Sequence, residues 1–145
     1  MRAMAIEEFG GPENVRPMDL PAPVAGAGEV VVRVVAASVN PVDWKIVAGY
    51  LKGRLPHAFP LVPGWDLAGT VEEIGPGVTR IRKGERVFAY ARKPLVQWGT
   101  FAELVAVPET SVAPMPARLL FEEAAAVPLA GLTAYQSLFG APGVS

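Results

Sequence analysis

Short apolar runs separated by glycine and proline fill the first two thirds of the chain. The densest run, residues 30–38, is rich in β-branched valine and lacks strict alternation, which predicts a strand buried on both faces. The same pattern predicts further strands over residues 2–9, 15–20, 64–75, 87–90 and 99–107. Residues 50–63 hold Gly53, Pro56, Pro60 and Pro63, and this density of breakers predicts a surface loop.

Helical patterns are few and come late. Asn40 is a suitable N-cap, Pro41 suits the first helical position, and Gly49 is placed to end a short helix. After Pro116 the sequence becomes rich in alanine, leucine and glutamate, with helices expected over 120–126 and 129–138. Strands first and helices last predict a mainly β, barrel-like body with a helical exit.

Composition narrows the possible functions. The chain has 145 residues and a net charge of −1, so nothing electrostatic favours nucleic acid or an anionic membrane as partner. No apolar run approaches the roughly 18 residues of a membrane span, and the N-terminus lacks a signal-peptide pattern, so a cytoplasmic location is expected. There is no cysteine and only one histidine, His57, which excludes disulfides, thiolate metal sites and multi-histidine zinc sites.

Three segments together resemble one protein family. Residues 38–45 contain an Asn-Pro-x-Asp motif, residues 63–87 form a long motif with several glycines, and residues 124–135 belong to the helical segment expected near the end of the chain. In this order they resemble the medium-chain dehydrogenase/reductase superfamily, in its zinc-independent, quinone oxidoreductase-like branch. The resemblance implies that the mainly β body is a GroES-like, partly open β-barrel with short helices.

The resemblance also implies a domain organisation. Residues 1–127 would form the GroES-like catalytic and substrate domain, and residues 128–145 would begin the linker helix toward a Rossmann domain that binds the cofactor. The chain carries no Gly-x-Gly-x-x-Gly turn of the kind that binds a dinucleotide. We therefore expect a chain that stops before its nucleotide-binding half and is inactive by itself.

Zinc chemistry is not expected. Zinc-dependent members of the superfamily have a cysteine in the region of Pro41 and a histidine–glutamate pair after the glycine that corresponds to Gly64. This chain has Trp65 and Asp66 after Gly64, and tryptophan cannot ligate zinc while one carboxylate alone would leave the ion unsatisfied.

The resemblance assigns candidate roles to the residues around these motifs. The candidate catalytic residues are Asn40, Asp43, Lys45 and Tyr50. Asn40 would hold a polar substrate or ribose group, whereas Lys45 and Tyr50 are possible donors to a substrate oxygen. Each has a plainer interpretation, since Asn40 and Asp43 can simply cap a helix and Lys45 can lie on a solvated face. Tyr50 also stands one position earlier than the tyrosine of enoyl reductase relatives.

Other candidates would line the pocket or touch the cofactor. Trp44, Trp65 and Asp66 are assigned to the substrate pocket, with a core position equally open for Trp65. Asn40 and Thr133 are assigned to the cofactor, with Thr133 in an expected turn over residues 131–134. The Thr133 hydroxyl can alternatively bond back within its own helix.

The leading hypothesis is an NADPH-dependent, zinc-independent oxidoreductase of quinones or α,β-unsaturated carbonyls that is a homodimer when intact. One alternative is an enoyl reductase of fatty-acid or polyketide type, in which Lys45, Lys52 and Arg54 would supply a basic patch for an acyl carrier. The other is a GroES-like binding or assembly module without chemistry.

Overall fold

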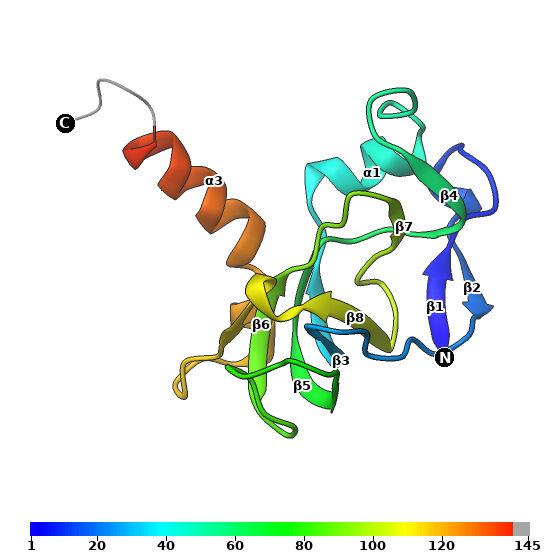
Figure 1. The fold of residues 1–145 in the computed structure, drawn as a ribbon. Helices are drawn as coiled ribbons and strands as arrows, with labels where there is room; N and C mark the ends of the chain where they lie inside the picture. The colour runs from blue at the N-terminus through cyan, green and yellow to red at the C-terminus, as the bar shows by residue number, and fades with distance from the viewer. Residues whose placement is uncertain (141–145) are drawn as a thin grey trace.

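Strands make up most of the regular secondary structure. The computed structural model describes residues 1–140, and Figure 1 shows a β body from which one helix extends. The strands are β1 (Arg2–Ala5), β2 (Arg16–Asp19), β3 (Glu29–Ser38), β4 (His57–Val62), β5 (Asp66–Ile74), β6 (Arg86–Tyr90), β7 (Val96–Trp98), β8 (Leu104–Pro108) and β9 (Val112–Pro114). The α-helices are α1 (Pro41–Val47), α2 (Phe121–Ala125) and α3 (Pro128–Phe139), and two 3₁₀ turns span Pro12–Asn14 and Glu109–Ser111. The mainly β prediction is confirmed.

The central sheet has five antiparallel strands in the order β8-β3-β5-β6-β9. Strands β1 and β2 form an antiparallel pair, and β4 and β7 form a parallel pair. Single bridges from Ala3 to Ala102 and from Ile6 to Leu61 tie these small sheets to the rest. Register shifts in β3 after Val31 and after Val34 bend the long strand, so the sheet curves into a partly open barrel.

The two largest apolar clusters fill most of the body. The larger lies within the central sheet and includes Val30, Val32, Leu67, Val87 and Val107. The second lies beneath α1 and comprises Ile6, Ile46, Val47, Leu61, Trp65 and Val96. Burial of β3 on both faces holds for Val30–Val32 only, because Arg33 and Val35 are exposed beyond them.

The prediction of a surface loop over residues 50–63 is wrong in its second half. Strand β4 occupies this stretch, and Leu61 and Val62 are fully buried. Its ladder with β7 pairs His57 with Val96 and Val62 with Trp98, and it is interrupted between these pairs. Pro60 lies in the interruption, where its missing N–H costs no ladder bond.

Two further boundaries differ from the prediction. The first strand ends at Ala5 instead of Phe9, and the strand expected from Gly99 begins at Leu104. Gly99, Thr100 and Phe101 instead donate backbone hydrogen bonds to the carbonyls of residues 62–64. These bonds satisfy the segment without a regular ladder, and the preceding residues form β7, a strand that the sequence pattern did not predict.

The helices largely follow the sequence pattern. Asn40 is the N-cap of α1 in extended conformation, and Gly49 follows the helix with φ +78°, in the left-handed region that favours glycine. Helix α3 leaves the body (Figure 1). Every residue from Ala130 to Gly140 is exposed. Residues 141–145, part of the expected linker, lie outside the described residues.

Candidate active site

Asp66 is the centre of a buried polar network. Its side chain is inaccessible to solvent at the first position of β5. Its Oδ2 accepts hydrogen bonds from Ser38 Oγ and Asn40 Nδ2, each at 3.0 Å. The backbone N–H of Leu129 donates to both carboxylate oxygens, at 3.1 and 3.2 Å. One carboxylate therefore joins the end of β3, the N-cap of α1 and the first turn of α3.

Asn40 is held rigidly by this network. Its Nδ2 donates to Asp66 Oδ2 and to Ser38 Oγ at 3.0 Å, so both amide hydrogens are engaged. The backbone N–H of Asn40 donates to Asp43 Oδ2 at 2.7 Å, which fixes the first turn of α1. The amide oxygen of Asn40 is the part of the side chain left to meet a ligand as an acceptor.

The carboxyl groups of Asp43 and Asp66 are both buried, and both have a raised pKa. Burial raises the pKa of Asp66, and hydrogen bonds from Asn40, Leu129 and Ser38 oppose the rise in part. Burial also raises the pKa of Asp43, the negative charge of Asp66 raises it further, and the Asn40 N–H opposes both. Asp43 and Asp66 thus form a polar pair that is buried from solvent at the start of α1.

Trp44, Lys45 and Tyr50 lie apart from this network, on the outer side of α1. Trp44 is 53% exposed and Tyr50 is 66% exposed. Their rings meet edge-on with centroids 5.5 Å apart, and Lys45 Nζ lies 5.7 Å from the centre of the Trp44 ring. A groove of about 410 Å³ beside them is lined by Val39, Asp43, Trp44, Pro63 and Phe101, among others. Neither Lys45 nor Tyr50 hydrogen-bonds to Asp66 or Asn40.

Trp65 has a core position. It is 9% exposed and packs in the apolar cluster beneath α1. Tyr90 meets it edge-on with centroids 6.1 Å apart, and the Arg92 guanidinium lies 5.5 Å from its ring centre. Burial raises the pKa of Tyr90, the positive charge of Arg92 opposes this rise, and the charge of Asp66 adds to it.

Thr133 lies within α3, so the helix expected over residues 129–138 is confirmed and no separate turn forms over residues 131–134. The helix continues because glycine interrupts an otherwise favourable sequence without breaking it. The Thr133 hydroxyl donates to the Leu129 carbonyl at 2.7 Å. This is the hydrogen bond within the helix that the sequence analysis gave as the alternative to a cofactor contact. Below it, a groove of about 680 Å³ is lined by Tyr90, Pro128 and Gly131, among others.

Sequence reasoning missed Ser38, Tyr90 and the backbone of Leu129. Ser38 carries a faint signal, a hydroxyl that ends an apolar strand two residues before Asn40. Tyr90 faces Asp66 only because β5 and β6 pair in that register. No local pattern indicates this pairing or the contact with Leu129.

The match with known proteins decides the family. The family model of the alcohol dehydrogenase GroES-like domain matches residues 26–117. The chain belongs to the medium-chain dehydrogenase/reductase superfamily. Its relatives place it among the quinone oxidoreductase-like members, and the predicted GroES-like fold is confirmed.

Among the relatives of this superfamily, the chloroplast envelope quinone oxidoreductase homolog of Arabidopsis thaliana is 36% identical over 145 residues, which cover 99% of this chain and 44% of that protein. The structure of Escherichia coli quinone oxidoreductase complexed with NADPH has a TM-score of 0.84 at 28% identity and covers 96% of this chain and 40% of its own. A structure named as an NAD-dependent alcohol dehydrogenase has a TM-score of 0.88 at 36% identity and covers 97% and 47%. The chain thus spans less than half the length of these relatives.

Within this superfamily member, the part of the chain that the structure describes contains no group of three His, Cys, Asp or Glu side chains that could hold a metal ion. None of the described helices is long and apolar enough to cross a membrane.

Proposed function

We propose that this chain forms the substrate side of a zinc-independent, NADPH-dependent oxidoreductase that reduces quinones or α,β-unsaturated carbonyls. The proposal rests on the position and the hydrogen bonds of the Asp66 carboxylate. In the position where zinc-dependent members carry metal ligands, a carboxylate is saturated by protein donors and positions Asn40.

The saturation of Asp66 argues against a metal ligand at this position. Both its oxygens already accept N–H or O–H hydrogen bonds, and a metal ion would have to displace them. The neighbouring Trp65 offers no ligand atom, and the one histidine, His57, is exposed on β4. The residues present therefore fit a mechanism without zinc.

The residues fit a nicotinamide through acceptor atoms. When bound, NADPH supplies the hydride. The Asn40 amide oxygen and the Thr133 oxygen, whose hydrogen is donated to Leu129, can accept hydrogen bonds from a carboxamide or a ribose hydroxyl. We assign most of the cofactor contacts to a Rossmann domain beyond residues 128–145, with residues 1–127 as the substrate domain. The preference for NADPH over NADH rests on the quinone oxidoreductase relatives.

Charge on the substrate oxygen would be met by the outer side of α1. Lys45 and Tyr50 are exposed donors, and Trp44 lines the adjacent groove. Reduction of a conjugated carbonyl needs stabilisation of the developing oxyanion and a proton afterwards, which a lysine or a tyrosine can supply. Asn40 acts in this scheme as an acceptor and a positioning residue, because its own hydrogens are already engaged.

The test compares substrates on the protein that contains this chain. NADPH oxidation is measured with 1,4-benzoquinone, with an enone and with an enoyl thioester, and the 145-residue chain is assayed in parallel. We expect turnover with the first two and none by the chain alone. Turnover only with the thioester would favour the enoyl reductase, in which exposed Lys45, Lys52 and Arg54 meet the acyl carrier. No turnover with any of them would favour an assembly module.

The variant Asn40→Ala should lower kcat/KM by about tenfold or more, the scale of losing a positioning contact near the chemistry. Asn14→Ala, outside the network, is the matched control and should leave kcat/KM unchanged.

Sedimentation of the same protein tests the proposed homodimer, and cell fractionation tests the cytoplasmic location.

A further inference from the structure

A third groove lies away from the Asp66 network. It has a volume of about 380 Å³, and its walls include Pro23, Val62, Trp98 and Val105. Lys93 and Glu29 are its charged side chains. None of Ser38, Asn40, Asp66 and Leu129 lines it, so the groove is separate from the candidate active site.

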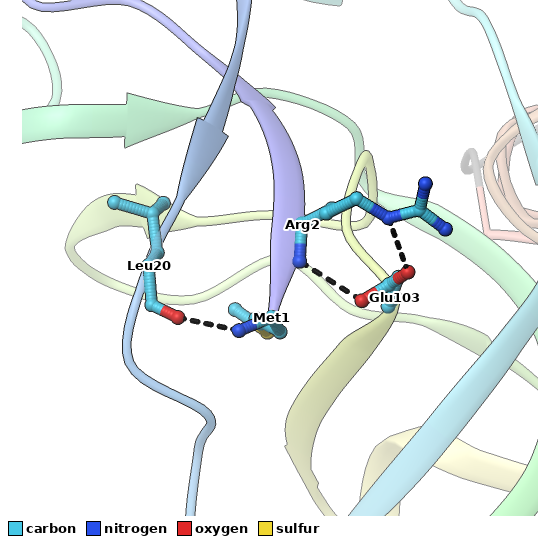
Figure 2. A network of polar contacts seen from close by, with 4 residues as sticks. All are labelled: Met1, Arg2, Leu20 and Glu103. Carbon is cyan, nitrogen blue, oxygen red and sulfur yellow. Dashed lines mark hydrogen bonds and ion pairs between the residues drawn. The ribbon is translucent and has the colours of Figure 1, made fainter.

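Hydrogen bonds fix two of its walls. Met1 N donates to the Leu20 carbonyl at 2.7 Å, next to the proline-rich segment that lines the groove. On the other side, Arg2 donates from its backbone N–H and its Nε to Glu103, at 2.9 and 2.8 Å, next to Leu104 of the wall. Figure 2 shows both contacts at the start of β1. The groove is thus formed before any ligand arrives.

Lys93 is an unpaired amine in this groove. Its side chain is partly buried, and it forms no ion pair or hydrogen bond with any of residues 1–140. Glu29, the other charged side chain of the groove, accepts a hydrogen bond from the Gly26 N–H instead. Burial lowers the pKa of Lys93, and Glu29 opposes the shift only in part. A lysine desolvated in an apolar site carries more of the neutral, nucleophilic amine near pH 7.

We propose that Lys93 is a reactive amine that adds to aryl-substituted α,β-unsaturated ketones bound in this groove. The apolar walls take the aryl group, and Trp98, 38% exposed, offers a ring for it to pack against. The Nζ lone pair forms a bond to the β carbon, and the electron pair of the carbon–carbon double bond moves toward the carbonyl as an enolate. The proton that nitrogen loses is taken up at the α carbon. No oxidant or reductant is needed.

The chain supplies its own controls, because it has four lysines and the other three, Lys45, Lys52 and Lys83, are exposed. The protein is incubated with 4-phenyl-3-buten-2-one, and labelling of each lysine is followed by peptide mass spectrometry. We expect Lys93 to be labelled several-fold faster than each exposed lysine. The saturated ketone 4-phenyl-2-butanone, which cannot form the bond, should slow labelling of Lys93 only.

Trp98→Ala should bring the labelling rate of Lys93 down toward that of the exposed lysines, whose rates should not change. Lys83→Gln is the matched control and should leave Lys93 labelling as it is. Equal labelling of all four lysines would overturn the proposal, and so would labelling of Lys93 that the saturated ketone does not slow.

Discussion

Asp66 keeps its carboxylate out of water by drawing donors from three separate elements. A fully buried charge is tolerated only where hydrogen bonds replace the lost hydration, and Ser38, Asn40 and Leu129 provide them. The order of α1 and the start of α3 therefore depends on one side chain, and the position of Asn40 depends on it too.

Replacing Asp66 with asparagine should destabilise the fold although the shape is kept. The new NH₂ group would face N–H or O–H donors and leave at least one of them unsatisfied, which costs about 1–3 kcal/mol. Urea unfolding of D66N measures the loss. Asp19→Asn makes the same chemical change on the surface and should leave the unfolding free energy within about 0.5 kcal/mol. Equal effects at the two positions would contradict the role of the network.

The raised pKa of Asp66 also predicts a pH dependence. Because the folded state holds this proton more tightly than the unfolded state, the group's contribution to stability falls as pH rises from the ordinary carboxyl value of 3.8 through the raised value, and is constant above it. The unfolding free energy of the protein minus that of D66N should therefore decrease across this window. Urea titrations at successive pH values measure it, and a difference that increases with pH would show that the folded state lowers this pKa.

At the residue scale, the sequence predicts those features that depend only on neighbouring residues along the chain. Asn40 as N-cap and Gly49 as the end of α1 follow from backbone preferences within one short segment. The partners of Asp66 do not, because the hydrogen bonds to Ser38, Asn40 and Leu129 span 28, 26 and 63 residues. The assignment of Asp66 to the substrate pocket stays a prediction.

At the scale of elements, the contact between β3 and β5 depends on a residue without a side chain. Gly69 pairs with Val34, and a Cβ built on it would lie 2.1 Å from the Arg33 carbonyl oxygen. Neither backbone can move without disturbing the sheet, so a side chain has no room at this position.

Gly69→Ala should therefore cost about 3 kcal/mol of unfolding free energy, the upper end of ordinary overpacking. Gly84→Ala is a matched control in a turn, where φ is +83° and no atom lies within 4 Å of the added Cβ. Its cost should stay near the 1–2 kcal/mol of a left-handed alanine. Urea unfolding compares the two, and a smaller loss for Gly69→Ala than for Gly84→Ala would contradict the packing at β3 and β5.

The two long strands were predictable. Strand β3 has a dense run of valines, β5 is a nine-residue strand without an internal proline, and both are close to their predicted bounds. Strands β4 and β7 are short, and one contains a proline, so their sequences look like loops. They form strands because they pair with each other and, for β4, because Leu61 and Val62 are buried in the core, neither of which is visible locally.

At the scale of the whole molecule, α3 exposes an apolar surface. Tyr135, Leu138 and Phe139 are 63%, 53% and 72% exposed on a helix that touches the body only at its first residues. An exposed apolar surface of this kind favours self-association of the 145-residue chain. Replacing these three side chains with glutamine should change its unfolding free energy by less than about 0.5 kcal/mol per site while reducing this self-association. Sedimentation measures the latter. A large loss of stability would mean that α3 packs on the body after all.

We propose that the protein containing this chain carries out its chemistry without zinc, with Asp66 as a hydrogen-bonded anchor. The most direct measurement follows NADPH oxidation with 1,4-benzoquinone by the protein that contains this chain, before and after treatment with a strong chelator, with the bound metal determined on the same samples. We predict unchanged turnover and far less than one zinc per chain. Turnover that disappears on chelation and returns with added zinc would contradict it.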